Sequence, residues 1–308
     1  MPALPRLVLF ALLATCTAAA TPAAAQQPEM KVTVTPVAAG VWMLTGPGGN
    51  IGVSIGPDGV ILVDDQVAPV VPKIREALAT LDPRPPRFLL NTHWHADHTG
   101  GNEAFGKAGA IILAHDNVRV RMRTEQFLEA FNQRVPPSPA GALPVITFTE
   151  AVTLHLNGGE VHVFHVAPAH TDGDAVVHFR TANVVHGGDV LFTGMYSFID
   201  LSTGGSVAGM IAALGRLAEL GDEQTKFIPG HGPLATRADV RAARDLLRDL
   251  CLKVQSLAKT GQSAEAIVAA KPSKDYDAKF ANPLLTGDLI VGMLAADLTK
   301  PGSAGCGG

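Results

Sequence analysis

Four side chains that could bind metal ions lie within six consecutive residues of this sequence. They are three histidines and one aspartate in the run His93-Trp94-His95-Ala96-Asp97-His98. An apolar stretch at 88–90 precedes this run, and Thr99-Gly100-Gly101 follows it. Imidazole and carboxylate groups are ligands of Zn²⁺ and related ions. Because so many ionisable groups in one place are costly without a cation, the spacing predicts a metal site.

Three more candidate ligands occur in similar settings further along the chain. His170 lies in the stretch 168–174, Asp189 follows 184–188, and His231 follows 227–230. Each comes after an apolar stretch that is typical of a strand, and each has a glycine nearby. Glycine lets the backbone crowd around an ion, and loops at strand ends commonly carry the functional groups of a rigid scaffold.

These seven residues, in this order, resemble the ligand motifs of the metallo-β-lactamase superfamily of metallohydrolases over roughly residues 31–235. The resemblance implies an α/β fold that is a four-layer αββα sandwich. It implies that one metal ion is bound by His93, His95 and His170, a second by Asp97, His98 and His231, and that Asp189 bridges them. Two Zn²⁺ ions per chain are the expected cofactor, with Fe or Mn as alternatives. Asp97 is also the candidate catalytic residue, which would orient the nucleophile or accept its proton.

The bridging position bears on the reaction. By the same resemblance, the commonest zinc β-lactamases have Cys at that position and Lys three residues later, whereas this chain has Asp189 and Phe192. Glyoxalase II-like thioesterases and many other members have Asp there. The stretch 199–206, however, is similar to a lactamase segment. We therefore predict an exported metal-dependent hydrolase acting on a carbonyl-type bond (lactam, lactone, ester or thioester), and weak β-lactamase activity stays open.

Two other functions also stay open. Sulfur dioxygenases resembling this superfamily use a single iron and share ligands of the His93, His95, His170 and Asp189 type. Metal analysis separates them from a two-zinc hydrolase. A non-catalytic metal-binding protein is the third hypothesis. Inactive relatives typically lose one or more ligands, and none is missing here.

Alternation and turn residues predict the elements that position these side chains. Residues 31–65 are typical of antiparallel strands with a hairpin turn at 56–59. Further strands are predicted at 87–91, 111–114, 152–156, 161–166, 175–179, 183–185 and 226–228. Helices are predicted at 70–81, 118–131, 206–220, 236–259, 263–270 and 284–298. Two strand-rich halves with helices favour a layered sandwich with the sheets inside.

The first 25 residues are typical of a secretory signal peptide. Arg6 is their one charged residue, a short apolar run follows it, and Ala23-Ala24-Ala25 provides a cleavage site. We expect a single domain at 26–300 that includes C-terminal helices, and a flexible tail at 301–308. The expected location is periplasmic or secreted. A lipoprotein anchored at Cys16 is less favoured, because Thr15 fits a lipobox poorly.

The composition limits the class of partner. The chain has 308 residues, of which 47% are hydrophobic and 17% charged, and this argues against disorder. The formal net charge is −4 for the whole chain and becomes −5 when Arg6 leaves with the leader. An acidic surface disfavours nucleic acid, so we expect a small-molecule substrate, no nucleic acid and no stable membrane insertion of the mature chain. The oligomeric state is left open.

A few other side chains carry weaker expectations. Cys251 falls in a helical pattern and Cys306 in a glycine-rich tail. A disulfide between them is possible in an oxidising compartment, but nothing requires it. Neither lies in a metal-ligand spacing, so buried or free thiols are favoured. Each ligand histidine should donate its other ring nitrogen to a hydrogen-bond partner. Candidates for these partners are Asp64, Thr92 and Asp174. Candidates to line an apolar pocket are Trp94, Phe192, Met195, Tyr196 and Phe198, although such residues more often form the core.

Overall fold

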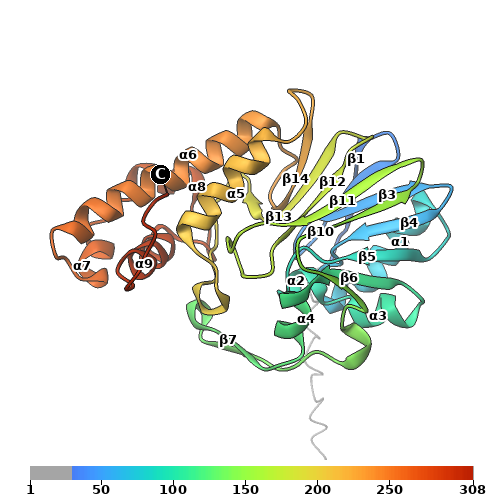
Figure 1. Cartoon of the computed structure of the whole chain (residues 1–308), viewed down its shortest axis with the longest axis horizontal. Helices are drawn as coiled ribbons and strands as arrows, with labels where there is room; N and C mark the ends of the chain where they lie inside the picture. Colours follow the sequence, from blue (N-terminus) through green and yellow to red (C-terminus); the bar gives the residue numbers. More distant parts are fainter. Residues whose placement is uncertain (1–29, 308) are drawn as a thin grey trace, which may run out of the picture.

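The computed structural model describes residues 30–307, and Figure 1 shows two large sheets packed together with helices on both outer faces. The predicted leader at 1–25 and Cys16 lie outside the described residues. Within residues 30–307, no helix combines the length and apolar character that a membrane crossing requires.

The first sheet has seven strands in the spatial order β1-β2-β3-β4-β5-β6-β9. Its strands are β1 (Thr33–Ala38), β2 (Val41–Thr45), β3 (Ile51–Gly56), β4 (Gly59–Val63), β5 (Pro86–Leu90), β6 (Ile111–His115) and β9 (Ile146–Phe148). The first four are antiparallel neighbours, as predicted, whereas β4, β5, β6 and β9 run parallel. Parallel strands end at the same edge of a sheet, so the segment that follows β5 emerges at that edge.

The second sheet has five strands in sequence order, from β10 to β14. They are β10 (Ala151–Leu156), β11 (Gly159–His165), β12 (Ala175–Phe179), β13 (Val184–Phe192) and β14 (Lys226–His231). All neighbours are antiparallel except β13 and β14, which are parallel. A separate hairpin consists of β7 (Gln126–Leu128) and β8 (Gln133–Val135).

The longer helices cover the outer faces of the sheets. The α-helices are α1 (Val71–Leu81), α2 (Ala96–Thr99), α3 (Asn102–Lys107), α4 (Asp116–Met122), α5 (Val207–Glu219), α6 (Arg237–Lys259), α7 (Ala264–Ala269), α8 (Lys274–Phe280) and α9 (Gly287–Leu298). Short 3₁₀ turns are η1 (Ala68–Val70), η2 (Glu129–Phe131), η3 (Ala140–Ala142) and η4 (Leu201–Thr203). The predicted capping box at Thr236 and Asp239 is present at the start of α6.

Three buried apolar clusters define the layers. One joins the inner faces of both sheets, through residues such as Val63 and Val177. The second joins the first sheet to α1 and α3, and the third joins the second sheet to α5, α6 and α9. The predicted αββα sandwich is thus confirmed, since each sheet has one face on its partner and one under helices.

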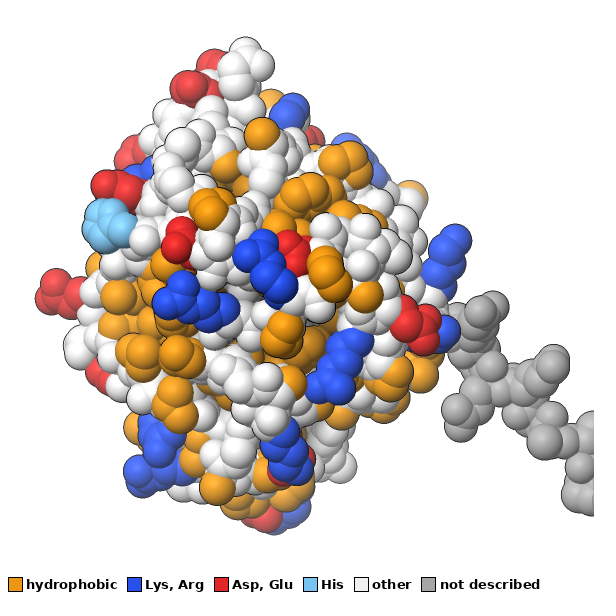
Figure 2. Space-filling view, turned by 90° about the vertical axis from the view of Figure 1, so that its right-hand side faces the viewer, with side chains coloured by type: hydrophobic (Ala, Val, Ile, Leu, Met, Phe, Trp, Pro, Cys, Tyr) orange, Lys and Arg blue, Asp and Glu red, His pale blue; other side chains and the backbone are white. Residues whose placement is uncertain are grey.

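The molecular surface at one end of the sheets is mixed in character. Figure 2 looks onto the right-hand side of Figure 1, and there Lys and Arg side chains alternate with Asp and Glu side chains among apolar ones. This face therefore does not concentrate charge of one sign.

The predicted helix at 118–131 is wrong beyond residue 122. Helix α4 ends at Met122, and the chain turns into the β7–β8 hairpin. The Nε2 atom of Gln126 donates to the carbonyls of Arg121 at 3.1 Å and Thr124 at 3.2 Å. This side chain satisfies carbonyls that the next helical turn would otherwise have bonded, so the helix can stop there.

The predicted last helix begins later than expected, and α8 was not predicted. The carbonyl oxygen Oδ1 of Asn282 accepts from the backbone N–H groups of Leu284 and Leu285, at 2.9 and 2.7 Å. This turn holds 282–285 outside the helix, and Thr286 then caps α9 at the N–H of Leu289.

The free-thiol interpretation of Cys251 and Cys306 is wrong, since the two form a disulfide. Cys251 is on the buried face of α6, and both cysteines belong to the core under the second sheet. The predicted flexible tail at 301–308 is correspondingly tied to α6 through Cys306, which is itself buried. Sequence spacing could not reveal this disulfide, because it depends on where the residues after α9 lie relative to α6.

Candidate metal centre

The first motif lies at the edge of the sheet where β5 ends. His93 and His95 are in the segment between β5 and α2, and Asp97 and His98 are on the single turn of α2. Both His93 and His98 are almost fully buried. The backbone N–H of Thr92 and its hydroxyl donate to the two carboxylate oxygens of Asp64, at 2.8 and 2.7 Å. This pair of bonds fixes the direction in which the chain leaves β5.

His170 is held in the loop between β11 and β12 by a neighbouring carboxylate. Oδ2 of Asp174 accepts from the backbone N–H groups of His170 and Thr171, at 2.7 and 2.9 Å. Burial raises the pKa of Asp174, to about 7, against these hydrogen bonds. Asp174 was a candidate to hold a ligand histidine, and it does so through the backbone and not through the ring.

Asp189 lies inside β13 and not beyond its end, contrary to the prediction. Sequence analysis placed the end of the strand at residue 185, before Gly187-Gly188. In the structure these glycines lie at an irregularity within the strand, where the pairing with β14 shifts and Gly188 has a φ of +51°. Such an irregularity re-aims the following side chain, and the carboxylate of Asp189 points into the site.

His231 is the last residue of β14, and its Nε2 lies 3.5 Å from Oδ2 of Asp189 on the neighbouring strand β13. A Cβ atom at Gly230 would lie 1.9 Å from Oδ1 of Asp189, so only glycine allows this approach. The ring of Phe192 stacks on that of His231, with centroids 5.4 Å apart and planes at 14°. This contact fixes the imidazole plane.

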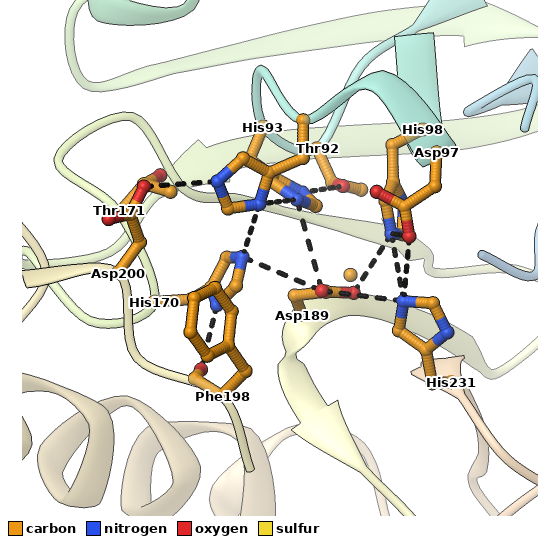
Figure 3. A network of polar contacts seen from close by, with 12 residues as sticks. Thr92, His93, Asp97, His98, His170, Thr171, Asp189, Phe198, Asp200 and His231 are labelled. Atoms are coloured by element: carbon orange, nitrogen blue, oxygen red, sulfur yellow. Dashed lines mark hydrogen bonds and ion pairs between the residues drawn. The ribbon is translucent and has the colours of Figure 1, made fainter. Parts of the chain in front are cut away.

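The structure brings all seven predicted residues together, as Figure 3 shows for six of them. They fall into two groups whose ligand atoms lie within 4.8 Å of one another: His93, His95, His170 and Asp189, and Asp97, His98 and His231. In the first group, Nδ1 of His95 is 3.1 Å from Nε2 of His93 and 2.9 Å from Nε2 of His170.

The second group is richer in carboxylates. Nε2 of His231 is 3.2 Å from Oδ2 of Asp97 and 3.3 Å from Nε2 of His98. The Asp189 carboxylate lies between the groups. Its Oδ1 is 3.0 Å from Nε2 of His98, and its Oδ2 is 3.5 Å from Nε2 of His170. One carboxylate therefore reaches both groups.

The far nitrogen of four imidazoles has a partner that sets the ring direction. Nδ1 of His93 contacts the hydroxyl of Thr92 at 3.1 Å, and Nδ1 of His98 contacts Oδ2 of Asp64 at 2.8 Å. Both partners were predicted from the sequence. The other two partners are the carbonyl of Phe198, 2.8 Å from Nδ1 of His170, and Oδ2 of Asp200, 3.1 Å from Nε2 of His95.

Asp200 is a functional residue that sequence reasoning missed. The stretch 199–206 was noted only for its similarity to a lactamase segment. In the structure Asp200 caps the short turn η4, where it accepts from the N–H of Ser202 and from the hydroxyl of Thr203. A capping aspartate close to a predicted site would have been worth testing as a partner of a ligand histidine.

Without a bound metal ion, the two groups would differ in charge. Burial lowers the pKa of His170 to about 4 and that of His93 well below its ordinary value, so both rings are neutral with free lone pairs. Burial alone would lower the pKa of His231 too, but Asp189 outweighs it and raises the pKa to about 9. The same balance raises the pKa of His98, and the imidazolium of His98 lowers the pKa of Asp189 against its burial.

The donor set fits divalent cations of the zinc type. Three imidazole nitrogens of the first group converge at 2.9–3.1 Å, yet three nitrogens cannot all donate to one another. Ligand atoms of a tetrahedral zinc ion, each about 2.0–2.1 Å from the metal, lie about 3.3 Å apart. Oδ1 of Asp189 is buried and makes no hydrogen bond of good geometry among the described residues, although Nε2 of His98 lies 3.0 Å away as an ion pair. A cation would satisfy these groups together.

Comparison with known proteins agrees with this geometry. The profile of the metallo-beta-lactamase superfamily matches residues 44–233, which span all seven side chains. The chain belongs to the metallo-beta-lactamase superfamily.

Individual known proteins resemble the chain only distantly. It is 30% identical to the 2,4-dinitroanisole O-demethylase subunit alpha of Nocardioides sp. (strain JS1661), over 54% of this chain and 48% of the relative. It thus spans about half the length of that relative. It is 28% identical to the hydroxyacylglutathione hydrolase of Anaeromyxobacter dehalogenans (strain 2CP-C), over 78% of this chain and 84% of the relative. The solved metallo-beta-lactamase from Pontibacter korlensis has the same fold, with a TM-score of 0.58, 19% identity, and coverage of 71% of this chain and 100% of that one.

A cavity lined mainly by apolar side chains opens onto the metal centre. Four of the five predicted pocket residues line it: Trp94, Phe192, Met195 and Phe198. Tyr196 does not, because its ring is buried and its hydroxyl donates to Oδ1 of Asp277 at 2.8 Å. The other lining residues, which the sequence did not single out, include Leu128 and Phe131 of the hairpin, the stretch 133–139, and Asn282, Leu284 and Leu285 before α9.

Proposed function

We propose that this chain is a metal-dependent hydrolase that cleaves a carbonyl-type bond, namely an ester, a lactone, a thioester or a lactam. The observation that carries the proposal is the position of Asp189, whose two carboxylate oxygens face the two ligand groups at 3.0 and 3.5 Å. The metal ligands are His93, His95, His170, Asp97, His98, His231 and the bridging Asp189. Zn²⁺ suits this set of imidazoles and carboxylates best, and Fe or Mn are alternatives.

When bound, a pair of divalent cations supplies water of lowered pKa and polarises the carbonyl oxygen. The residues of the chain hold the metal ions and move the protons of the reaction. The neutral rings of His93 and His170 offer lone pairs without competing protons. Asp97 is 37% exposed, whereas His98 beside it is fully buried. Asp97 lines the cavity, so its carboxylate can accept a proton there and pass it to the leaving group.

A panel of β-lactams, lactones, esters and thioesters tests the proposal with the chain lacking residues 1–25. Zinc-loaded protein should hydrolyse at least one class, and a chelator should abolish turnover until zinc is restored. Asp97→Asn should lower kcat at least 100-fold, as expected for loss of a general base. Asp245→Asn, on the exposed side of α6, is the matched control and should stay within twofold. If no substrate in the panel is hydrolysed by zinc-loaded protein, the hydrolase proposal fails.

The presence of a second group of metal ligands argues against a single-iron oxygenase. Such an enzyme needs the first group, whereas here Asp97, His98 and His231 form a second set of ligand atoms within 4.8 Å. Measured metal content decides between the two, since two zinc ions per chain support hydrolysis. One iron per chain with oxygen uptake supports the oxygenase. Retention of metal without turnover of either kind would support a non-catalytic metal-binding protein.

We further propose that the mature chain works in an oxidising compartment, as a periplasmic or secreted protein. The disulfide between Cys251 and Cys306 supports this, because such bonds persist mainly outside the reducing cytosol. Fractionation of cells expressing the full chain, with mass analysis of the mature N-terminus, tests both the export and the cleavage near Ala25.

A further inference from the structure

A cavity of about 820 Å³ lies directly over the metal centre. His95, Asp97 and His231 form part of its lining, so a molecule inside it would touch the reacting region. Its size is in the upper part of the range for ligand pockets. The inference drawn from it rests on the proposed hydrolase function and specifies the substrate class.

Three separate segments supply the walls of the cavity. Leu128 and Phe131 come from the β7–β8 hairpin, Met195 and Phe198 from the loop after β13, and Leu284 from the turn before α9. The hairpin packs against the loop after β13 through the rings of Phe131 and Phe198, whose centroids are 5.0 Å apart. Figure 1 shows the hairpin extending beneath the loop that precedes α5. The walls are therefore mainly hydrocarbon, and they are joined to each other.

Charge is scarce in the walls. Outside the metal centre, Arg134 is the one charged residue among the described residues that line the cavity. Its side chain is 73% exposed and pairs with Glu125 at 2.7 Å. No described wall residue therefore offers a buried cation to a substrate carboxylate or phosphate. At the rim, Leu284 is 64% exposed, an apolar side chain in water beside an apolar cavity.

We propose that this cavity binds an uncharged hydrocarbon acyl group, so that the preferred substrates are neutral esters, lactones or thioesters with a long or bulky apolar acyl chain. Burial of such a chain is favourable because it removes methylene groups from water. Each buried methylene should improve kcat/KM by about three- to fourfold until the cavity is full.

Met195 sets the inner limit of this acyl site. It lines both this cavity and a second one of about 270 Å³ that lies beneath α6. Phe192 lines both as well, but it is fixed by its stacking on His231. Met195 is a flexible side chain that contacts Nδ2 of Asn282 through its sulfur at 3.8 Å. Met195→Ala should therefore join the cavities and move the preferred acyl length upward.

The first experiment compares acyl lengths on the zinc-loaded protein. Thioesters of one small neutral thiol with C2, C4, C8 and C12 acyl chains are assayed for kcat/KM, together with carboxylate-terminated acyl chains of the same lengths. We expect a rise with length and at least a tenfold preference for the uncharged chain. Hydrolysis that is indifferent to length, or that favours the carboxylate, would overturn the inference and leave the hydrolase function intact.

The second experiment measures binding without turnover. Trp94 lines the cavity, and the chain has only one other tryptophan, Trp42. In the Trp42→Phe variant, C4 and C12 acyl amides, which resist hydrolysis, should change Trp94 fluorescence, the C12 amide at a lower concentration. Equal or absent responses would contradict the acyl site even if the protein proved inactive on every thioester.

Leu284→Asp places a negative charge at the rim, and Val145→Asp is its matched control. Val145 is 71% exposed and does not line the cavity. The loss in kcat/KM caused by Leu284→Asp should grow with acyl length, to at least tenfold for C12, and Val145→Asp should change no substrate more than twofold. If the two variants behave alike, the cavity is not the acyl site.

Discussion

Nε2 of His95 lies 3.1 Å from Oδ2 of Asp200, a buried residue 105 positions further along the chain. Because Nε2 is engaged, Nδ1 of His95 faces His93 and His170. Burial would raise the pKa of Asp200, but the hydrogen bond with His95 lowers it, to about 2, so the carboxylate is ionised at neutral pH. The pair therefore selects both the tautomer and the direction of the ring.

Asp200→Asn should weaken metal binding at the first group by 10- to 100-fold, as is typical when a partner of a ligand histidine is lost. The measurement is competition for Zn²⁺ with a chelating dye, and Asp245→Asn serves as the control. The capping role of Asp200 in η4 is local, so the melting temperature should fall by only a few degrees. Unchanged zinc affinity in a folded Asp200→Asn protein would rule out the positioning role.

Asp64→Asn should act mainly on the second group. Oδ2 of Asp64 contacts His98, and residue 64 has a φ of +63°, a conformation that asparagine tolerates. The backbone bond from Thr92 can persist at Oδ1, so the first group keeps its support. At limiting zinc, the variant should retain about one ion per chain where the parent retains two, as measured by atomic emission after dialysis. Equal loss of both ions would contradict the separation of the groups.

The seven side chains of the site could be predicted because ligand chemistry is local in the sequence. His93 to His98 lie within one short run, and an apolar stretch precedes each of the other ligands in the sequence. The partner residues were harder to predict. Asp64 and Thr92 lie near strand ends and were proposed, whereas Asp200 reaches His95 only through the folding of a distant loop.

The remaining errors have the same physical origin in tertiary contacts. The end of α4 depends on a side chain, Gln126, that satisfies the helix carbonyls. The continuity of β13 past Gly188 depends on pairing with β14, and the bond between Cys251 and Cys306 depends on where α9 ends. The cavity could not be predicted either, because its walls come from segments that meet only in the folded chain.

Zinc affinity should rise with pH. In the metal-free chain, Asp189 raises the pKa of His231 to about 9 against its burial, and the pKa of His98 is raised too. Both rings therefore carry a proton at pH 7 that a metal ion must displace. Below pH 9 the second ion should bind more tightly as pH increases, with release of about two protons. Calorimetry of zinc binding in buffers of different ionisation enthalpy measures this number, and the absence of any proton release would contradict the assigned charge states.

Loss of the disulfide should destabilise the chain without affecting zinc binding. Cys251 and Cys306 close a loop across 55 positions, which the chain-entropy relation converts to about 4 kcal/mol. Cys251→Ser combined with Cys306→Ser should lower the free energy of unfolding by about 2–4 kcal/mol in urea titrations. Reducing agent should have the same effect on the parent and none on the double variant. A double variant as stable as the parent would show that the bond contributes nothing to stability.

The second ligand group requires glycine at position 49, because any side chain there would collide with His98. A Cβ atom there would lie 2.1 Å from Cε1 of His98, which is fully buried and cannot move away. The loop 45–50 also packs against the α2 turn through a backbone hydrogen bond, since the N–H of Gly49 donates to the carbonyl of Asp97 at 3.0 Å. Gly49→Ala should lower the affinity for the second ion at least tenfold and cost about 1–3 kcal/mol of stability through overpacking.

Gly141→Ala is the matched control, because a Cβ atom at that glycine would meet only Cγ of Glu103, at an ordinary 3.6 Å. Its zinc stoichiometry and melting temperature should equal those of the parent. If Gly49→Ala also retained two ions per chain with parental affinity, His98 would have to be free to shift. The close packing of the loop against the second ligand group would then not be what positions His98.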